Sequence, residues 1–401
     1  MEHDRPRGGG EHHHGSHRHL VDVFKGDEFE RDEFEEGEQP PHGRGAIDAI
    51  VVPTIRHPRW LTYATRLALA LGCHLVSLHS RNWSRAREAA QAMPAGLRYI
   101  SADVDHVDRL RLPDFETTAV LRDTPFARTT DLSAKRNTGL LLARLLGWRR
   151  IVFLDDDIEV GRLADVERAA ALLDTYDAVG MHIGGYPDNS VVCHAHRLTG
   201  GHQESFVGGG ALAVAVDPGR TPSFFPNVYN EDWFYLLGER RLRRLAVAGQ
   251  VKQRPYDPFD RPVRAREQEF GDVLAEGVYW LLDGDAAAGW RAAADAAYWR
   301  DFLAKRRRFV EDVLSRVRRL PTGPRHNRHA MENSLLAALG RLRRIEPELC
   351  VRYLKAWSVD RRRWAAHLDE LPHLEFATAD AVKWLVKDGE RGLHWYGSMV
   401  D

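Results

Sequence analysis

The stretch Ile151–Val160, IVFLDDDIEV, runs four apolar residues directly into three consecutive aspartates. The apolar run predicts a buried strand, and Asp155, Asp156 and Asp157 follow at its carboxyl end. Because side chains alternate along an extended backbone, Asp155 and Asp157 are expected to share one face while Asp156 points elsewhere. Two such carboxylates repel each other unless a cation lies between them, and Mg2+ or Mn2+ suits oxygen ligands. The alternative is an acidic loop that caps a helix starting near Leu163.

Strand and helix patterns alternate on both sides of this stretch. Short apolar runs predict strands at AIDAIVVPT, which starts at Ala46, and then at HLVSLHS, LRYIS, RRIVFL and DAVGMHI. Helical spacing of apolar residues predicts helices between them, over Trp60–Leu71, Ser84–Ala92, Ser133–Leu146 and Leu163–Asp174. This alternation is typical of an α/β fold in which a mostly parallel sheet has helices on both faces. Ligands of such sheets bind at the carboxyl ends of the strands.

Composition and charge exclude several classes of protein. The 57 lysines and arginines nearly balance the 58 aspartates and glutamates in 401 residues, so net charge gives no reason to expect nucleic acid as a partner. Cys73, Cys193 and Cys350 are far apart, which argues against a disulfide framework or a zinc site. We find no signal-peptide pattern and no apolar run of the roughly 18 residues that a transmembrane helix needs. A soluble, cytoplasmic protein is expected.

Three zones are expected along the chain. Residues 1–45 are rich in Gly, His and Glu and have no periodic apolar face, which predicts a disordered tail. The tail histidines suit a transition metal, but a solvated tail or tag remnant is the simpler interpretation. Residues 46–285 hold the alternating pattern and are expected to form the catalytic domain. Residues 286–401 predict a helical C-terminal extension.

The C-terminal zone carries several tryptophans and a basic stretch. The tryptophans are interpreted as packing residues rather than as platforms for sugars: Trp357, Trp364, Trp384 and Trp395. The stretch KRRRFVEDVLSRVRRL predicts a helix with a solvated charged face, and peripheral docking on an anionic membrane is the less favoured alternative. This zone is also expected to cover an acceptor site or to form a homodimer interface.

A basic helix start precedes the aspartate strand. The segment DLSAKRNTGLLLARLLGW places Lys135, Arg136 and Asn137 in the first turns of a helix that leads directly into it. The free N–H groups of a helix start and the fork of an arginine suit phosphate oxygens. The plain alternative is that these basic side chains are simply solvated.

Taken in order, five segments resemble a known family. They are VVPTIR after the first strand, AKRNTGLLLA before the fourth, FLDDD after it, FVGGGALAV from Phe206 and FPNVYNEDWFYLL from Phe225. This order is similar to the GT-A glycosyltransferases, particularly the family 2-like group, over about residues 47–237. The resemblance implies a GT-A fold and a donor that is a nucleotide-diphosphate sugar.

The resemblance also implies roles for individual residues. Asp155 and Asp157 would hold the ribose and a Mg2+ or Mn2+ ion, and Asp232 would be the catalytic base, with Glu231 beside it. Gly208 and Gly209 would form the wall on the acceptor side. The remaining residues implied to bind the donor are Pro53, Thr54, Arg56, Lys135, Arg136 and Asp156. For Asp232 the competing interpretation is a helix cap, since YNED precedes WFYLL and Asn230 or Asp232 suits that role.

Two positions depart from the family pattern. The family's aspartate after the second strand is replaced by Ser80, Arg81 and Asn82, so Asp103 or Asp105 after the third strand would have to hold the base. The later histidine that ligates metal in many members is also absent, and the matching segment AVAGQVKQRPYDPFD offers other oxygen ligands: Gln253, Asp257 and Asp260.

The reaction implied is glycosyl transfer to the hydroxyl of a small molecule, a glycan or a lipid-linked acceptor. Its transition state builds charge on the leaving diphosphate, which a metal and Arg136 would stabilise while a carboxylate takes the acceptor proton. A sugar nucleotidyltransferase is one alternative, but PTIRHPRW has no glycine with which a loop could approach a triphosphate. A catalytically inactive GT-A-like binding protein is the other, and it would be expected to lose the acidic residues that this chain keeps.

Overall fold

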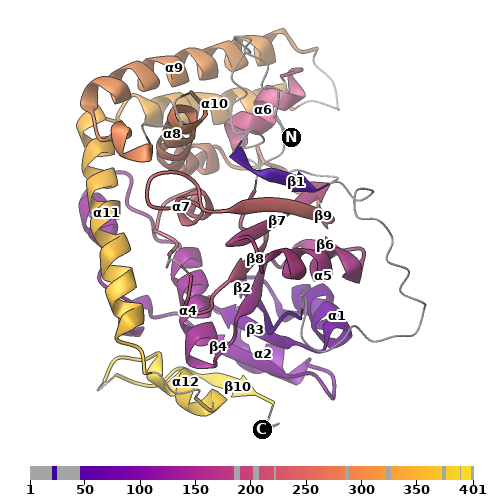
Figure 1. Ribbon diagram of the computed structural model, residues 1–401. Coiled ribbons are helices and arrows are strands. Elements are labelled where there is room, and N and C mark those ends of the chain that lie inside the picture. The colour runs from indigo at the N-terminus through magenta and orange to yellow at the C-terminus, as the bar shows by residue number, and fades with distance from the viewer. Residues whose placement is uncertain are drawn as a thin grey trace, which may run out of the picture.

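The computed structural model describes residues 20–24, 46–184, 190–201, 207–220, 223–284, 289–321, 327–372, 376–388 and 390–398. Within them, ten strands form one sheet with the order β1-β9-β7-β8-β5-β2-β3-β4-β10, and β6 pairs with β9 as well. Helices lie on both sides of this sheet (Figure 1). The histidine cluster of the predicted tail lies outside the described residues.

Four neighbouring parallel strands of the sheet come from residues 49–154. Each is a short run of apolar residues buried on both faces: β2 (Ala49–Thr54), β3 (His74–His79), β4 (Tyr99–Asp103) and β5 (Arg150–Leu154). The connections contain α1 (Thr62–Leu71), α2 (Ala86–Gln91), α3 (Glu116–Leu121) and α4 (Leu132–Leu145), with 3-10 turns at Pro58–Leu61 and Val107–Arg109. The predicted strands and helices are therefore confirmed in this half, with small shifts at their ends.

The order of these strands creates a switch point between β2 and β5. The chain proceeds from β2 outward to β3 and β4, and then returns to β5 on the other side of β2. The connections after β2 and β5 consequently diverge, which leaves a crevice at the carboxyl ends of the two strands. Thr54 ends β2, and Asp155 follows the last residue of β5.

The second half extends the sheet beyond β5. Here β8 (Ala211–Ala215) runs antiparallel between β5 and β7 (Ala178–Gly184), and β9 (Leu245–Gln253) is parallel to β7. The short β6 (Ile158–Val160) pairs with the end of β9. The helices of this half are α5 (Leu163–Leu172), α6 (Val191–Leu198) and the one-turn α7 (Glu231–Tyr235). The predicted α/β fold with a mostly parallel sheet and helices on both faces is confirmed (Figure 1).

Both edges of the sheet are closed by strands from the ends of the chain. The strand β1 (Asp22–Phe24) pairs in parallel with β9, and β10 (Trp395–Gly397) pairs antiparallel with β4 (Figure 1). The expectation that nothing before residue 46 is packed is wrong for β1, and the C-terminal zone is not purely helical. Strands of three residues are too short to show a period in the sequence, and their pairing depends mainly on backbone hydrogen bonds.

The helices of the C-terminal part lie on the side of the sheet that α4 covers, and they pack on α3, α4, α6 and α7. They are α8 (Pro262–Gly284), α9 (Ala296–Arg319), α10 (Arg328–Leu342), α11 (Pro347–Asp369) and α12 (Thr378–Trp384), with a 3-10 turn at Trp290–Ala293. One hydrophobic cluster contains residues of α4, of these helices and of the central strands, including Trp357 and Trp364, whose predicted packing role is confirmed. A second cluster joins the opposite face of the sheet to α1 and α5. None of the described helices is long and apolar enough to cross a bilayer.

A fully buried arginine holds the first two of these helices together. Arg306 of α9 contacts three carboxylates of α8, with N–O distances of 2.9 Å to Glu269, 3.0 Å to Asp272 and 2.7 Å to Glu276. These residues lie three, four and seven positions apart, so they share one face of α8. Burial opposes the charge of Arg306, but the three carboxylates outweigh it and raise its pKa.

Replacing Arg306 by Met tests how much this cluster of ion pairs contributes to the stability of the fold. Removing the cation leaves three buried carboxylates without compensation, so R306M should lower the free energy of unfolding by about 3–5 kcal/mol. The matched control R308M changes an exposed arginine of the same helix and should cost about 0.5 kcal/mol or less. Urea unfolding of the wild type, R306M and R308M measures the difference in stability. Equal unfolding midpoints for R306M and R308M would show that the cluster does not stabilise the fold.

Candidate active site

The three aspartates lie in a turn at the switch point. The backbone N–H of Ile158 donates to the carbonyl of Asp155 at 3.1 Å, so the chain turns between β5 and β6. Alternation of side chains does not continue through a turn, and the prediction that Asp155 and Asp157 share a face is wrong. Asp156 and Asp157 face a common partner, Arg56, whereas Asp155 turns toward Arg136.

Arg56 and Thr54 hold the second and third aspartates from β2. One guanidinium nitrogen of Arg56, Nη1, lies 2.7 Å from Asp156 Oδ1 and 2.9 Å from Asp157 Oδ2. The hydroxyl of Thr54 donates to the other oxygen of Asp156 at 2.5 Å. Burial raises the pKa of Asp156 to about 6, although Arg56 and Thr54 favour its charged form. The pKa of Asp157 is raised by the same burial and by the charge of Asp155.

Arg136 joins the aspartate turn to the start of α7. Its Nη2 lies 3.1 Å from Asp155 Oδ1, and its Nη1 lies 2.5 Å from Glu231 Oε1. Only 2% of its surface is exposed. Burial opposes the charge of Arg136, but Asp155, Glu231 and Asp232 raise its pKa further than burial lowers it. Arg136 thus lies at the candidate site, where two carboxylates occupy its terminal nitrogens.

Asp232 ties α7 to the glycine loop before β8. Its Oδ2 accepts the backbone N–H of Gly209 at 2.5 Å, and its Oδ1 accepts the N–H of Trp233 at 2.9 Å. Asn230 makes no side-chain capping bond and has a left-handed backbone with φ of 61°. Burial raises the pKa of Glu231 to about 7, and the neighbouring Asp232 adds to this effect. Burial also raises the pKa of Asp232, whereas Arg136 and the N–H of Gly209 lower it by a smaller amount.

Lys135 lies under the strand ends. Its ammonium group donates to the carbonyl of Thr54 at 2.8 Å and to the hydroxyl of Ser80 at 2.7 Å, and it lies 3.1 Å from Asp131. It is 1% exposed, and burial lowers its pKa despite Asp131. Lys135 therefore fixes the ends of β2 and β3 relative to each other, and in this arrangement its donors face protein oxygens.

The carboxylates expected to hold the base are committed to the backbone. Asp103 accepts the N–H of Ala86, the first residue of α2, at 2.8 Å. Asp105 accepts the N–H of Arg81 at 3.0 Å and also bonds Arg85. Both acids thus shape the loop after β3. The buried Pro53 precedes Thr54 in β2, as the resemblance implies for that strand end.

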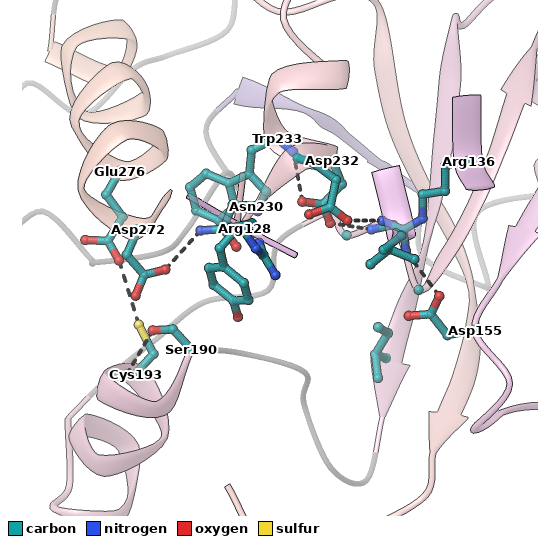
Figure 2. A pocket seen from close by; sticks show the side chains of 17 residues that line it. Arg128, Arg136, Asp155, Ser190, Cys193, Asn230, Asp232, Trp233, Asp272 and Glu276 are labelled. Atoms are coloured by element: carbon teal, nitrogen blue, oxygen red, sulfur yellow. Dashed lines mark hydrogen bonds and ion pairs between the residues drawn. The ribbon is translucent and has the colours of Figure 1, made fainter. Parts of the chain in front are cut away.

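A cavity of about 150 Å3 connects the candidate site to α8 (Figure 2). At the sheet end it is lined by Arg136, Asp155, Glu231, Asp232 and by Gly208, Gly209 and Gly210. At the other end it is lined by Ser190, Cys193, Asp272 and Glu276. The side-chain amide of Asn230 donates to Asp272 at 3.0 Å and so links the two ends.

The α8 residues of this cavity were not predicted from the sequence. Burial raises the pKa of Asp272 to about 7, and Glu276 and Glu269 add to this effect against Arg306. A signal for these residues exists in the segment EFGDVLAEGVYWLL, where acids recur on one face of an otherwise apolar helix. Such a face in a buried helix indicates a buried cation or a cavity.

The aspartates do not form a complete metal site as they stand. Asp155 is paired with Arg136 and Asp157 with Arg56. Across the described part of the chain, no three side chains of His, Cys, Asp or Glu are grouped so that they could hold a metal ion. Two of the predicted extra ligands are paired elsewhere: Asp257 accepts the N–H of Phe259 at 2.9 Å, and Asp260 lies 3.0 Å from Arg264. Any metal here needs ligands from a donor phosphate or from water as well.

Comparison with known proteins gives distant likenesses. No protein family matches the chain, and no curated protein does. The structure of A197 from STIV matches with 14% identity and a TM-score of 0.29, covering 52% of this chain and 86% of that one. The mannosyltransferase PcManGT from Pyrobaculum calidifontis, solved with GDP-Man and Mn2+, matches with 14% identity and a TM-score of 0.36, covering 82% and 91%. Likenesses of this distance carry no argument about function.

Replacing Gly209 by Ala tests the packing around Arg136. A Cβ at this position would lie 2.5 Å from Arg136 Nη1, which carboxylates hold on the other side. G209A should therefore cost about 1–3 kcal/mol of stability, as overpacking of an enclosed site does. The control is G161A, because a Cβ at Gly161 meets no atom within 4 Å. Thermal unfolding should separate the two variants, and equal melting temperatures would show that Arg136 moves aside without cost.

Proposed function

We propose that the protein is a glycosyltransferase that moves a sugar from a nucleotide-diphosphate sugar to a hydroxyl acceptor. The observation that carries the proposal is the meeting of three sequence segments at the switch point. Thr54 and Arg56 come from the end of β2, the aspartates from the end of β5, and Glu231 with Asp232 from α7, all joined through hydrogen bonds or ion pairs. Crevices at switch points of open α/β sheets are where ligands bind.

We propose that the donor lies along the carboxyl ends of β2 and β5. Pro53, Thr54 and Asp156 would contact the base and ribose, since the Thr54 hydroxyl and the Asp156 carboxylate form the polar part of that strand end. The partly exposed guanidinium of Arg56 is suited to a phosphate, which it would bind bidentately. Gly208 and Gly209 would leave room for the sugar beside Asp155, because their backbone carries no side chain into the cavity.

Mg2+ or Mn2+ is the proposed cofactor, held by Asp155 and Asp157 together with the donor's phosphates. When bound, such an ion neutralises charge on the diphosphate that leaves. The chain's own contribution is to orient these carboxylates, Asp155 through Arg136 and Asp157 through Arg56.

Asp232 is the proposed general base. The acceptor hydroxyl would lose its proton to the Asp232 carboxylate while its oxygen bonds to the anomeric carbon and the nucleoside diphosphate leaves with the electron pair of the broken bond. The N–H groups of Gly209 and Trp233 orient the carboxylate. Glu231 is the second candidate, although its contact with Arg136 makes a positioning role the simpler one.

A donor screen tests the proposed function. Nucleotide-diphosphate sugars would be added with Mn2+, with Mg2+ or with a chelator, and thermal unfolding would be followed. A donor at about 100 times its Kd should stabilise the protein by about 2.7 kcal/mol, and D157N should lose most of this effect while its own fold survives. If no member of a panel covering the common nucleotides stabilises the protein with either metal, the chain is a non-catalytic relative of the fold instead.

The pH dependence of Asp232→Asn tests the base. The pKa of Asp232 is raised by burial, and the base acts only when deprotonated, so kcat/KM of the wild type should rise with pH through the titration of the Glu231–Asp232 pair. D232N should lower kcat by about 10²–10⁴ and remove this rise. Asn keeps only one acceptor for two N–H groups, so about 1–3 kcal/mol of stability should be lost as well.

Glu231→Gln is the comparison that separates the two carboxylates. It disturbs the contact with Arg136 but leaves Asp232 in place, so E231Q should lose activity and keep a rise with pH. Normal turnover in D232N, or a pH rise that disappears only in E231Q, would assign the base to Glu231.

A further inference from the structure

A second, smaller cavity adjoins the candidate active site. It has a volume of about 60 Å3 and is lined by residues 125–130 of the loop before α4, by Arg266 and Glu267 of α8, and by Arg341 of α10. Arg128 lines this cavity and also the cavity of the candidate active site (Figure 2). The two cavities therefore share the side chain of Arg128 as a wall.

Three guanidinium groups meet at the smaller cavity without a carboxylate partner. Arg128, Arg266 and Arg341 form no ion pair with any residue that the structure describes. Their lack of partners is not general for this surface, because Arg264, two residues before Arg266, lies 3.0 Å from Asp260. The cluster therefore differs from the ordinary paired arginines beside it.

The charges at this cavity do not balance. Burial lowers the pKa of Arg341, and the nearby charges of Arg266 and Arg344 lower it further, against a smaller effect of Glu267. The three arginines that line the cavity face one lining carboxylate, that of Glu267, which leaves an excess of about two positive charges. A phosphate monoester carries about 1.5–2 negative charges at neutral pH, so its charge matches this excess.

Packing holds two of the arginines in place. The guanidinium carbon of Arg341 lies 5.3 Å from the centre of the Phe126 ring, and its Nη1 donates to the carbonyl of Pro125. Phe126 in turn stacks on Phe270 of α8, with ring centres 4.6 Å apart. The guanidinium carbon of Arg128 lies 5.8 Å from the ring centre of Tyr229. Cations that are already ordered lose less freedom when an anion binds.

The loop before α4 adds hydrogen-bond donors to the arginines. Thr129 and Thr130 line the cavity and are exposed. Neither their hydroxyls nor their backbone N–H groups donate to another atom of the described residues. Phosphate oxygens accept several hydrogen bonds at once, which guanidinium, hydroxyl and N–H groups together supply.

The cluster is close to the proposed base and separate from the proposed donor site. Burial raises the pKa of Glu231, and the charge of Arg128 acts against burial together with that of Arg136, so Arg128 is near the start of α7. Arg56, which is proposed to meet the donor's phosphates, pairs with Asp156 and lines neither cavity. The cluster is thus placed to hold the other substrate.

We propose that Arg128, Arg266 and Arg341 bind a phosphate group of the acceptor, whose hydroxyl then lies in the cavity with Asp232. That the ligand is the acceptor rests on the proposed function, whereas the phosphate site is a property of the three arginines. Arg266 and Arg341 lie beyond residues 47–237, so the family resemblance implies no role for them.

Inorganic phosphate is the probe for this site. Its binding to the full chain would be followed by phosphorus nuclear magnetic resonance in chelator, without a donor and at constant ionic strength. R266M and R341M should each weaken phosphate binding about tenfold, because each removes hydrogen bonds to a charged group. R343M is the matched control, since Arg343 is an exposed arginine at the end of α10 that does not line the cavity, and its affinity should equal that of the wild type.

Two results would overturn the proposal. One is the absence of saturable phosphate binding in the wild type, and the other is equal phosphate affinity in the wild type, R266M, R341M and R343M. Arg266 is exposed, so R266M should keep the stability of the wild type even if R341M does not. R266M therefore decides the test should R341M fail to fold.

Vesicles distinguish a soluble acceptor from a lipid. Sedimentation would compare phosphatidylcholine vesicles with and without phosphatidic acid. Retention on phosphatidic acid that R266M lowers and R343M does not would assign the phosphate to a lipid acceptor. Phosphate binding without such a difference on vesicles would assign it to a soluble acceptor.

This test is independent of the donor screen. Phosphate binding that R266M weakens, with no donor binding to any nucleotide site, would retain the phosphate site and reject glycosyl transfer. Donor binding in the wild type with equal phosphate affinity in all four proteins would retain the proposed function and reject the phosphate-bearing acceptor.

Discussion

The ion pairs of Arg136 are the interaction on which the rest of the site depends. This arginine starts on α4, meets Asp155 after β5 and meets Glu231 at the start of α7. Because Arg136 is enclosed, replacing it by a neutral residue would leave the buried carboxylate of Glu231 uncompensated, so the three elements must keep their relative positions. Gly139, one turn further along α4, lets the helix lie close to Val51, since a Cβ there would be 2.8 Å from its side chain. The same closeness carries Arg136 to the switch point.

Two other arginines also pair with more than one carboxylate. Arg56 forms ion pairs with Asp156 and Asp157, and Arg306 forms ion pairs with three carboxylates of α8. In each group the negative charge exceeds the positive charge, so burial and mutual repulsion raise carboxylate pKa values. Those of Glu231 and Asp272 reach about 7. The cavity between these groups is thus bounded by carboxylates whose charged forms burial disfavours and whose arginine partners oppose that effect.

The sequence predicts elements well wherever a pattern is long. The strands and the helices of the first half follow from apolar periodicity. Arg136, Thr54 and the aspartates are predicted to lie at the carboxyl ends of the strands, because these ends meet at one edge of a parallel sheet, and the structure has them there. The pairing among these side chains is not predictable from the sequence. A turn ends the alternation of side chains at Asp155, and which arginine each aspartate meets depends on how distant elements pack together. The strands β1 and β10 were missed because three residues show no period, and the acids of α8 because their partner lies on another helix.

A continuous line of polar contacts joins the helical extension to the aspartate turn. Arg306 of α9 lies 3.0 Å from Asp272, and Asp272 accepts the side-chain amide of Asn230 at 3.0 Å. Asn230 has a left-handed backbone and directly precedes Glu231, which Arg136 connects to Asp155. A left-handed non-glycine residue costs free energy and persists only where its surroundings fix it, and Asp272 supplies part of that restraint. The extension therefore helps to position the carboxylates of α7 from a distance, and this restraint requires α8 to pack against α7.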